Sequence, residues 1–244
     1  MEQFIPIFKR ELLAYFRTPV AYVFTVIFLV AASACTFFLG NFFDSNHAGL
    51  DLFFAFHPWL YLFLVPAVGM RLWAEDRRSG AVELIFSLPM TIGEAVLAKF
   101  AAAWVFLGFA LVLTFPMVIT VNYLGTPDNA VIASGYLGSF LMSGAFLAIA
   151  NLTSALSKNQ VVSFILSCLA CLIMVFMSWG VFSRLLSDYL PVGLVDFIVS
   201  VGFLRHFEAL SRGFIDLRNL LYFAAVITIS LTLTGIVLNR LKAA

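Results

Sequence analysis

Histidines and charged residues, the groups best suited to chemistry, are scarce in this chain. Only 11% of the residues are charged, and the centres of the long apolar runs contain no Asp, Glu, Lys or Arg. His57 is the one histidine well inside such a run, and beside Trp59 we interpret it as a packed or interfacial residue. His47 could join it in a metal site, but two ligands do not complete one. We therefore predict no metal site and no cofactor in this chain.

The sequence also lacks a recognisable catalytic constellation. Ser33, Ser163 and Ser167 lie in apolar runs with no evident partner for intramembrane nucleophilic catalysis. Cys168 and Cys171 share a helix face, and we interpret them as small buried residues and not as a disulfide frame. No G-x-x-x-x-G-K-[ST] motif is present, so the chain cannot bind ATP by that device. We predict that it is not an enzyme.

The charged residues are densest in Trp73–Lys99, between two long apolar runs. Gly80 interrupts this charged segment, and Ala81–Leu88 then provides about two helical turns. Pro89 stops that helix, because it lacks an N–H and disfavours a helical conformation in the residue before it. A short, delimited helix between two spans is typical of a part that contacts something in water. The alternative is a solvated loop whose charges only fix the topology, and for Arg77 and Arg78 the two interpretations have about equal support.

Composition places the chain in a membrane. Hydrophobic residues make up 63% of it, and its mean hydropathy is +1.04. Soluble domains contain roughly 45–50% apolar residues. The net charge of +1 gives no basic surface for nucleic acid. We predict an all-α polytopic membrane protein.

The hydrophobic pattern predicts an amphipathic helix at 2–17 followed by six transmembrane helices. Pro58 and Pro66 in the second span and Pro116 in the third are expected to bend these helices. Before the last span, Val192–Leu204 is apolar but too short to cross, which indicates an interfacial or re-entrant segment. The spans are predicted at about 20–39, 52–72, 95–121, 131–156, 161–182 and 219–239, with loops at 73–94 and 183–218.

Lysine and arginine are distributed unequally between the two sides of this topology. Six spans place both termini on one side, and that side has ten Lys or Arg residues against four on the other. The positive-inside rule then makes both termini and the 73–94 loop cytoplasmic. The ten are Lys9, Arg10, Arg17, Arg71, Arg77, Arg78, Lys99, Lys158, Arg240 and Lys242, and the four are Arg184, Arg205, Arg212 and Arg218.

Three stretches resemble the ABC-2 type permeases, the membrane halves of ATP-binding-cassette exporters. They are FKRELLAYFRTPVAYVF at Phe8–Phe24, AEDRRSGAVELIFSLPMTIGEAVLAKF at Ala74–Phe100 and HFEALSRGFIDLRNLLYF at His206–Phe223. The chain is most similar to the gliding-motility permease branch, and more loosely to the copper-processing permeases of nitrous-oxide reductase clusters. The resemblance covers one whole six-span unit.

The resemblance implies an N-terminal elbow helix, a cytoplasmic coupling helix and extracellular helices before the sixth span. It further implies a second permease subunit, identical or different, and a separate ATPase dimer that binds ATP and Mg in a bacterial inner membrane. A channel or secondary transporter is a less favoured alternative, because the span centres are uncharged. The residues expected to matter are Asp76, Arg77, Gly80, Glu83, Ile85, Ser87 and Pro89 for ATPase coupling; Arg10, Glu11, Arg17 and Pro19 in the elbow; and His206, Glu208, Arg212, Gly213 and Asp216 in an extracellular cap.

Overall fold

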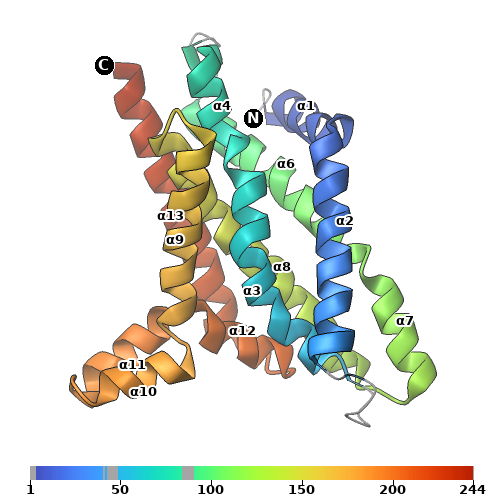
Figure 1. The fold of residues 1–244 in the computed structure, drawn as a ribbon. Helices are drawn as coiled ribbons and strands as arrows, with labels where there is room; N and C mark the ends of the chain where they lie inside the picture. Colours follow the sequence, from blue (N-terminus) through green and yellow to red (C-terminus); the bar gives the residue numbers. More distant parts are fainter. Residues whose placement is uncertain (1–3, 41, 43–48, 84–90, 244) are drawn as a thin grey trace.

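The computed structural model describes residues 4–40, 42, 49–83 and 91–243, and their regular structure is entirely helical. This confirms the predicted all-α polytopic fold (Figure 1). The helices are α1 (Phe4–Arg17), α2 (Pro19–Ala34), the π-helical turn η1 (Cys35–Leu39), α3 (Asp51–Gly69), α4 (Arg71–Ser79), α6 (Ile92–Val112), α7 (Phe115–Leu124), α8 (Asn129–Leu156), α9 (Gln160–Phe176), α10 (Gly180–Ser187), α11 (Val192–Val201), α12 (Phe203–Ser211) and α13 (Leu217–Ala243).

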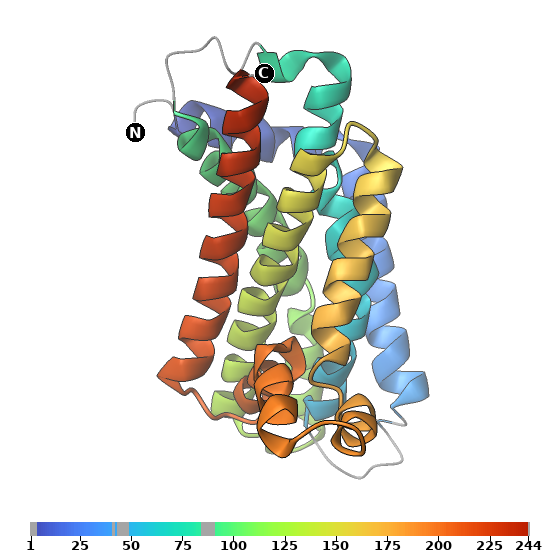
Figure 2. The same cartoon turned by 90° about the vertical axis from the view of Figure 1, so that its left-hand side faces the viewer.

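Five helical segments in the described part of the chain are long and apolar enough to cross a membrane. A sixth crossing results if α9 and α10, which meet at a bend of 67°, count as one span. Both chain termini and α4 lie at one end of the bundle, called the terminal end below (Figures 1 and 2). The turn between α7 and α8 and the helices α10 to α12 lie at the other, distal end.

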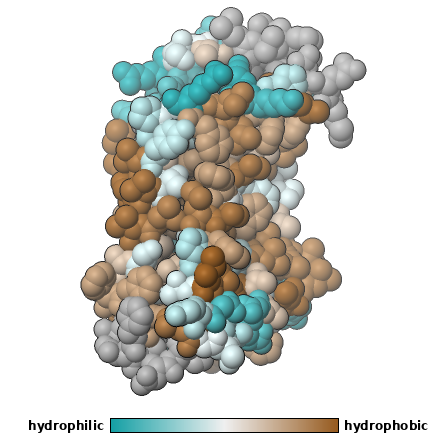
Figure 3. All heavy atoms as spheres, turned by 90° about the vertical axis from the view of Figure 1, so that its right-hand side faces the viewer, coloured by the Kyte–Doolittle hydropathy of each residue, from teal (hydrophilic) through white to brown (hydrophobic). Residues whose placement is uncertain are grey.

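Surface hydropathy follows the same axis. On the face shown in Figure 3, a brown apolar zone crosses the middle of the molecule, and hydrophilic residues gather toward the two ends. The exposed side chains of α2 and α13 are largely apolar, among them Val30 and Leu221 at 62% and 58% exposure. Exposed apolar side chains are favourable in lipid and unfavourable in water. We therefore infer that this apolar zone is the part of the molecule that lies in the bilayer.

Helix α8 is the centre of the bundle and packs against α3, α4, α6, α9, α12 and α13. Its small residues allow these close approaches, as is usual for helices packed in membranes. A Cβ at Gly138 would lie 2.9 Å from Leu210 of α12, and one at Gly144 would lie 2.7 Å from Trp104 of α6. The Trp104 indole donates a hydrogen bond to the carbonyl of Phe140 at 2.9 Å and stacks on its ring.

The three prolines expected to bend the second and third spans lie in different helical settings. Pro58 and Pro66 both lie inside α3, which is one α-helix from Asp51 to Gly69. The third span is interrupted at Leu113 and Thr114, close to the bend expected at Pro116. Pro116 itself lies in the first turn of α7, where its missing N–H costs no helical hydrogen bond. The break leaves carbonyl groups to be satisfied, and the Thr114 hydroxyl donates to the Leu111 carbonyl.

The segment before the last span forms short helices at the distal end. Helices α10 and α11 project sideways from the bundle (Figure 1), and α12 packs against α8 and α13. Helix α11 covers most of the apolar run that was judged too short to cross. It is ten residues long, and Val192, Leu194 and Phe197 are exposed on it.

Candidate functional site

The charged segment after the second span begins as a helix, not as the loop predicted at 73–94. Helix α4 follows α3 after a single turn residue, Met70, so Trp73 is a fully buried helical residue. Gly80 ends α4 in the left-handed conformation, with φ of 76°, which a residue without Cβ adopts at little cost. Residues 81–83 are helical again, which agrees with the predicted restart after Gly80.

Two polar residues of α8 fasten α4 to the bundle. The Ser154 hydroxyl accepts hydrogen bonds from the backbone N–H groups of Trp73 and Ala74, both at 3.0 Å, and donates to the Met70 carbonyl at 2.8 Å. It thereby satisfies backbone groups left open at the junction of α3 and α4. The Trp73 indole N–H donates to Asn151 Oδ1 at 2.7 Å. The α3–α4 junction is therefore fixed to α8 through both backbone and side-chain hydrogen bonds.

An ion-paired cluster joins three helices at the terminal end. Lys99 of α6 lies with its Nζ 3.1 Å from Glu11 Oε1 of α1 and 2.8 Å from Asp76 Oδ2 of α4. The Lys99 side chain is only 4% exposed, while those of Glu11 and Asp76 are 17% and 22% exposed. The ammonium also lies 5.3 Å from the centre of the Trp73 ring, within cation–π range. We call Glu11, Lys99 and Asp76 the ionic joint.

The electrostatics of the joint favour the ionised form of Glu11. Burial alone would raise the pKa of this carboxyl, but the ammonium of Lys99 and the guanidinium of Arg10 outweigh burial and lower the pKa below its ordinary value. Arg10 donates to Glu11 Oε1 at 2.7 Å from the exposed side of α1. One buried cation is thus balanced by two carboxylates, and a second, exposed cation compensates the excess charge.

The elbow also packs against α6 through its aromatic residues. The ring of Tyr15 stacks on Phe106 at 5.2 Å, and Phe16 meets Phe106 and Phe109 edge-on. Thr18 separates α1 from α2 and donates its hydroxyl to the Tyr15 carbonyl. Pro19 then starts α2, in the first-turn position expected for it.

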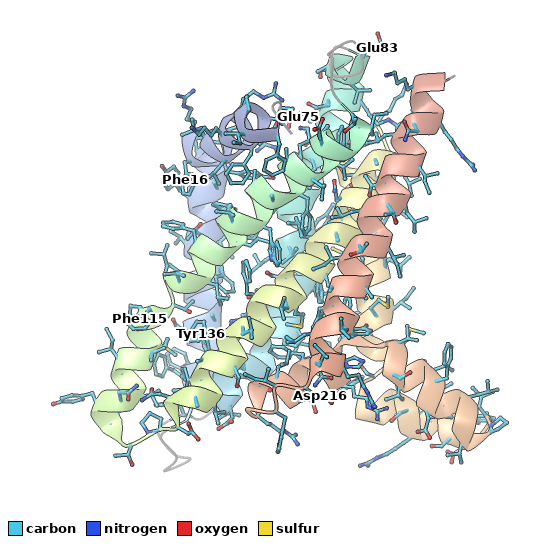
Figure 4. All side chains as sticks on the ribbon, turned by 180° about the vertical axis from the view of Figure 1, so that it is seen from behind. Phe16, Glu75, Glu83, Phe115, Tyr136 and Asp216 are labelled. Carbon is cyan, nitrogen blue, oxygen red and sulfur yellow. The ribbon has the colours of Figure 1, made fainter. Side chains whose placement is uncertain are left out.

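The residues predicted for ATPase coupling divide into two groups. Asp76 and Arg77 turn toward the protein body, since Asp76 pairs with Lys99 and the Arg77 guanidinium donates to the Ala155 carbonyl of α8. Glu83 is exposed at the outermost part of the terminal end, beyond Glu75 and Phe16 (Figure 4). Ile85, Ser87 and Pro89 lie outside the described residues. Of the elbow residues, Glu11 belongs to the ionic joint, while Arg10, Arg17 and Pro19 are exposed.

The predicted cap residues gather at the distal end. His206 is buried, and Glu208 and Arg212 form an exposed pair at 3.7 Å. Gly213 turns the chain with φ of 89° and lies against Val131 of α8. Asp216, labelled at this end in Figure 4, accepts a hydrogen bond from the backbone N–H of Arg218 at the start of α13.

Sequence reasoning gave no role to Lys99, Asn151 or Ser154. Lys99 was counted only as a topology-setting cation, although a lysine, here the eighth residue of α6, is rarely buried unless it is paired. Asn151 and Ser154 are about one helical turn apart near the end of an apolar span. That spacing places two polar side chains on one helix face and could have predicted a polar contact there. The capping box of α6, in which Thr91 and Glu94 bond each other's backbone N–H, was also missed.

His57 lies apart from this site, within the bundle. It is fully buried, its Nδ1 lies 2.9 Å from the Phe53 carbonyl, and the rings of Phe28, Phe53, Phe54 and Tyr61 surround it. Across the described residues, no three His, Cys, Asp or Glu side chains gather as a metal site would require.

Comparison with protein families gives one match. The model of the family described as CcmB protein matches residues 4–190, which run from the elbow through α10. The comparison with curated proteins finds no match. The match covers most of the 244 residues, so the chain belongs to the CcmB family, and it is a multi-pass membrane permease subunit of the ABC-transporter class.

Proposed function

We propose that this chain, as a CcmB-family permease, couples ATP hydrolysis by a separate ATPase subunit to substrate movement across the bacterial inner membrane. In this proposal the ATPase docks at the terminal end, around the helical residues that follow Gly80. The observation that supports it most is the ionic joint, because it ties the elbow, α4 and α6 together next to that exposed tip. A loop that only connected two spans would need no such desolvated junction.

In the proposed mechanism, force is transmitted through the contacts of α4. A push on the tip reaches α4, which is held to α8 by Ser154 and follows α3 after one residue. The same push reaches α6 through Lys99 and the elbow through Glu11. The second and third spans would therefore move with the elbow as one unit. The break at Leu113–Thr114 gives the third span a place to bend farther along.

The finer parts of the proposal rest on family membership and on the charge distribution. The Lys and Arg excess at the terminal end supports a cytoplasmic location of both termini. A second permease subunit and an ATPase dimer complete the assembly. The CcmB family is one of haem-exporter permeases, so haem is our candidate cargo. The gliding-motility and copper-processing branches stay as alternatives for the closer relationship.

The dependence on a partner can be tested by ATP hydrolysis. The purified chain in lipid nanodiscs should hydrolyse no ATP, because the sequence contains no Walker-type phosphate loop. Co-expression with candidate ATPase subunits should yield a complex whose hydrolysis is lost when the ATPase carries a substitution in its own phosphate loop. Hydrolysis by the chain alone, persisting after contaminating ATPases are removed, would contradict the proposal.

A further inference from the structure

Helices α10 and α11 form a hairpin at the distal end that has no role in the coupling proposal. The hairpin extends past α9, away from the bundle (Figure 1). Within the described part of the chain, its two helices pack mainly on each other. We call residues 180–201 the distal arm.

The distal arm leaves and re-enters the bundle at one point. The Ser178 hydroxyl, in the break after α9, accepts a hydrogen bond from the backbone N–H of Leu204 in α12 at 2.9 Å. A Cβ at Gly202 would lie 2.4 Å from the same oxygen, so the returning chain needs a residue without a side chain there. The Tyr222 hydroxyl of α13 donates to the carbonyl of Val201. These contacts hold the root of the arm, and the remainder is in contact with its surroundings.

The distal arm exposes large apolar side chains. Those more than half exposed are Val181, Leu185, Val192, Leu194 and Phe197. Isolated apolar residues are common on protein surfaces, but a contiguous group of them marks a contact with lipid or with another protein. The arm therefore has a partner outside the described part of the chain.

Each helix of the arm separates its polar residues from its apolar ones. At helical spacing, Ser183, Arg184 and Ser187 share one side of α10, opposite Leu185. On α11 the polar side is a narrow stripe that contains Asp196, and apolar residues fill the wider remainder. Short helices with one wide apolar side and one polar side are typical of segments that lie in the plane of a bilayer surface.

The geometry of α9 places the arm at the depth of such a surface. Helix α9 begins directly after the polar residues Lys158 and Asn159, and its 17 residues rise by about 25 Å, less than the roughly 30 Å of a hydrocarbon core. The bend of 67° turns α10 mainly sideways, so its eight residues add only about 5 Å along the direction of α9. The arm thus begins where the hydrocarbon of the distal leaflet ends. A bend of less than a right angle does not return α10 into the bilayer, which argues against a re-entrant segment.

Aromatic residues give a second indication of the same depth. Trp179, at the root of the arm, is 37% exposed and meets Trp59 of α3 edge-on at 5.7 Å. Tyr189, in the turn between α10 and α11, is largely exposed. Tryptophan and tyrosine concentrate at the boundary between membrane and water, where one end of the ring system is in an apolar environment and the other is hydrated.

We propose that the distal arm is a lipid anchor, which lies between the headgroups and the acyl chains of the distal leaflet with its apolar side toward the acyl chains. Its partner is lipid because the arm directly continues the exposed apolar surface of α9, on which Ile165, Leu169 and Ile173 are more than half exposed. By occupying volume in the leaflet beside α9, the arm allows so short a helix to complete a crossing. This inference depends on neither the ATPase nor the cargo, since it concerns only the fit of the chain to the bilayer.

Collision accessibility of nitroxide labels tests the depth of the arm in the full chain, in phosphatidylcholine nanodiscs. The native cysteines are replaced by alanine, and one label is then attached through L185C or L194C on the apolar side, or through S187C on the polar side. Oxygen partitions into lipid, so it should relax the labels of L185C and L194C at least about threefold more than a water-soluble nickel chelate does, with the opposite order at S187C. V30C on α2 and K158C in the α8–α9 turn give the lipid and water references.

A matched pair of substitutions on α10 tests the sidedness of the anchor. L185D places a carboxylate on the apolar side, and S187D places the same group on the polar side. L185D should raise the nickel accessibility of the L194C label at least about threefold, because a carboxylate resists entry into the acyl region, while S187D should leave it unchanged.

Three results would overturn the proposal. Labels at L185C and L194C that behave like K158C would place the arm in water, as a free surface for a protein partner. Low accessibility of these labels to both reagents would mean that another protein chain covers the arm. Equal effects of L185D and S187D would show that the arm has no lipid-facing side.

Discussion

At the scale of single residues, Lys99 is the most consequential side chain at the terminal end. It is a buried ammonium whose charge is compensated by two carboxylates from different helices. Removal of one member of a buried ion pair costs more than the pair contributes, because the remaining charges stay desolvated. Lys99 holds both carboxylates, so its loss leaves Glu11 and Asp76 facing each other without their shared cation.

Lys99→Met should therefore destabilise the folded chain by about 2–4 kcal/mol, a value below that of a fully buried pair because both carboxylates are partly exposed. Thermal unfolding in nanodiscs measures this difference. Arg10→Gln is the matched control, since its side chain is 63% exposed, and its effect should stay within about 0.5 kcal/mol. Equal effects of the two substitutions would show that the joint contributes nothing beyond surface charge.

At the scale of elements, the end of α4 depends on the conformation of Gly80. The chain leaves α4 with positive φ there, and no atom lies within 4 Å of where a Cβ would stand, so backbone strain is the whole cost of adding one. Gly93, in the first turn of α6, has equally open space around it but no positive φ. These two glycines form a matched pair.

Gly80→Ala should destabilise the chain by about 1–2 kcal/mol, because an L-residue is strained in the left-handed region. Gly93→Ala should be neutral or stabilise it by up to about 1 kcal/mol, because alanine favours the helix. The comparison uses the same unfolding assay for both variants. A Gly80→Ala variant as stable as Gly93→Ala would mean that α4 does not end in the left-handed turn.

Several elements were predictable because a local signal determined each of them. Hydrophobic length identified the five helical segments long enough to cross, and the Gly80 break appears where the sequence predicted it. The helical state of Arg71–Ser79 was missed because its charges suggested a loop, whereas tertiary contacts with Ser154 and Asn151 hold it as a helix. The break near Pro116 falls two residues earlier than the proline because proline suits the first turn of the following helix.

At the scale of the whole molecule, the sequence predicts the distribution of charge between the two ends of the bundle but not the ion pairs within each end. The sequence indicated which charges share an end of the bundle, since that requires only the count of crossings. It could not indicate which of them pair, because Glu11, Asp76 and Lys99 are far apart along the chain and meet only through the packing of α1 and α4 on α6. Asp76 and Arg77, predicted for ATPase coupling, thus make contacts within the permease. Of the predicted coupling residues in the described part of the chain, Gly80 and Glu83 are exposed, and Glu83 is the charged one.

The most direct measurement of the coupling proposal is co-purification of the ATPase with charge-reversed permeases. Glu83→Arg should leave membrane insertion normal but weaken ATPase association at least tenfold, or uncouple ATP hydrolysis from transport, because a reversed charge at a desolvated contact costs several kcal/mol. Lys158→Glu, an exposed reversal of equal size in the short turn between α8 and α9, should behave as the native chain. Native-like association and coupled hydrolysis in Glu83→Arg would contradict docking of the ATPase at this tip.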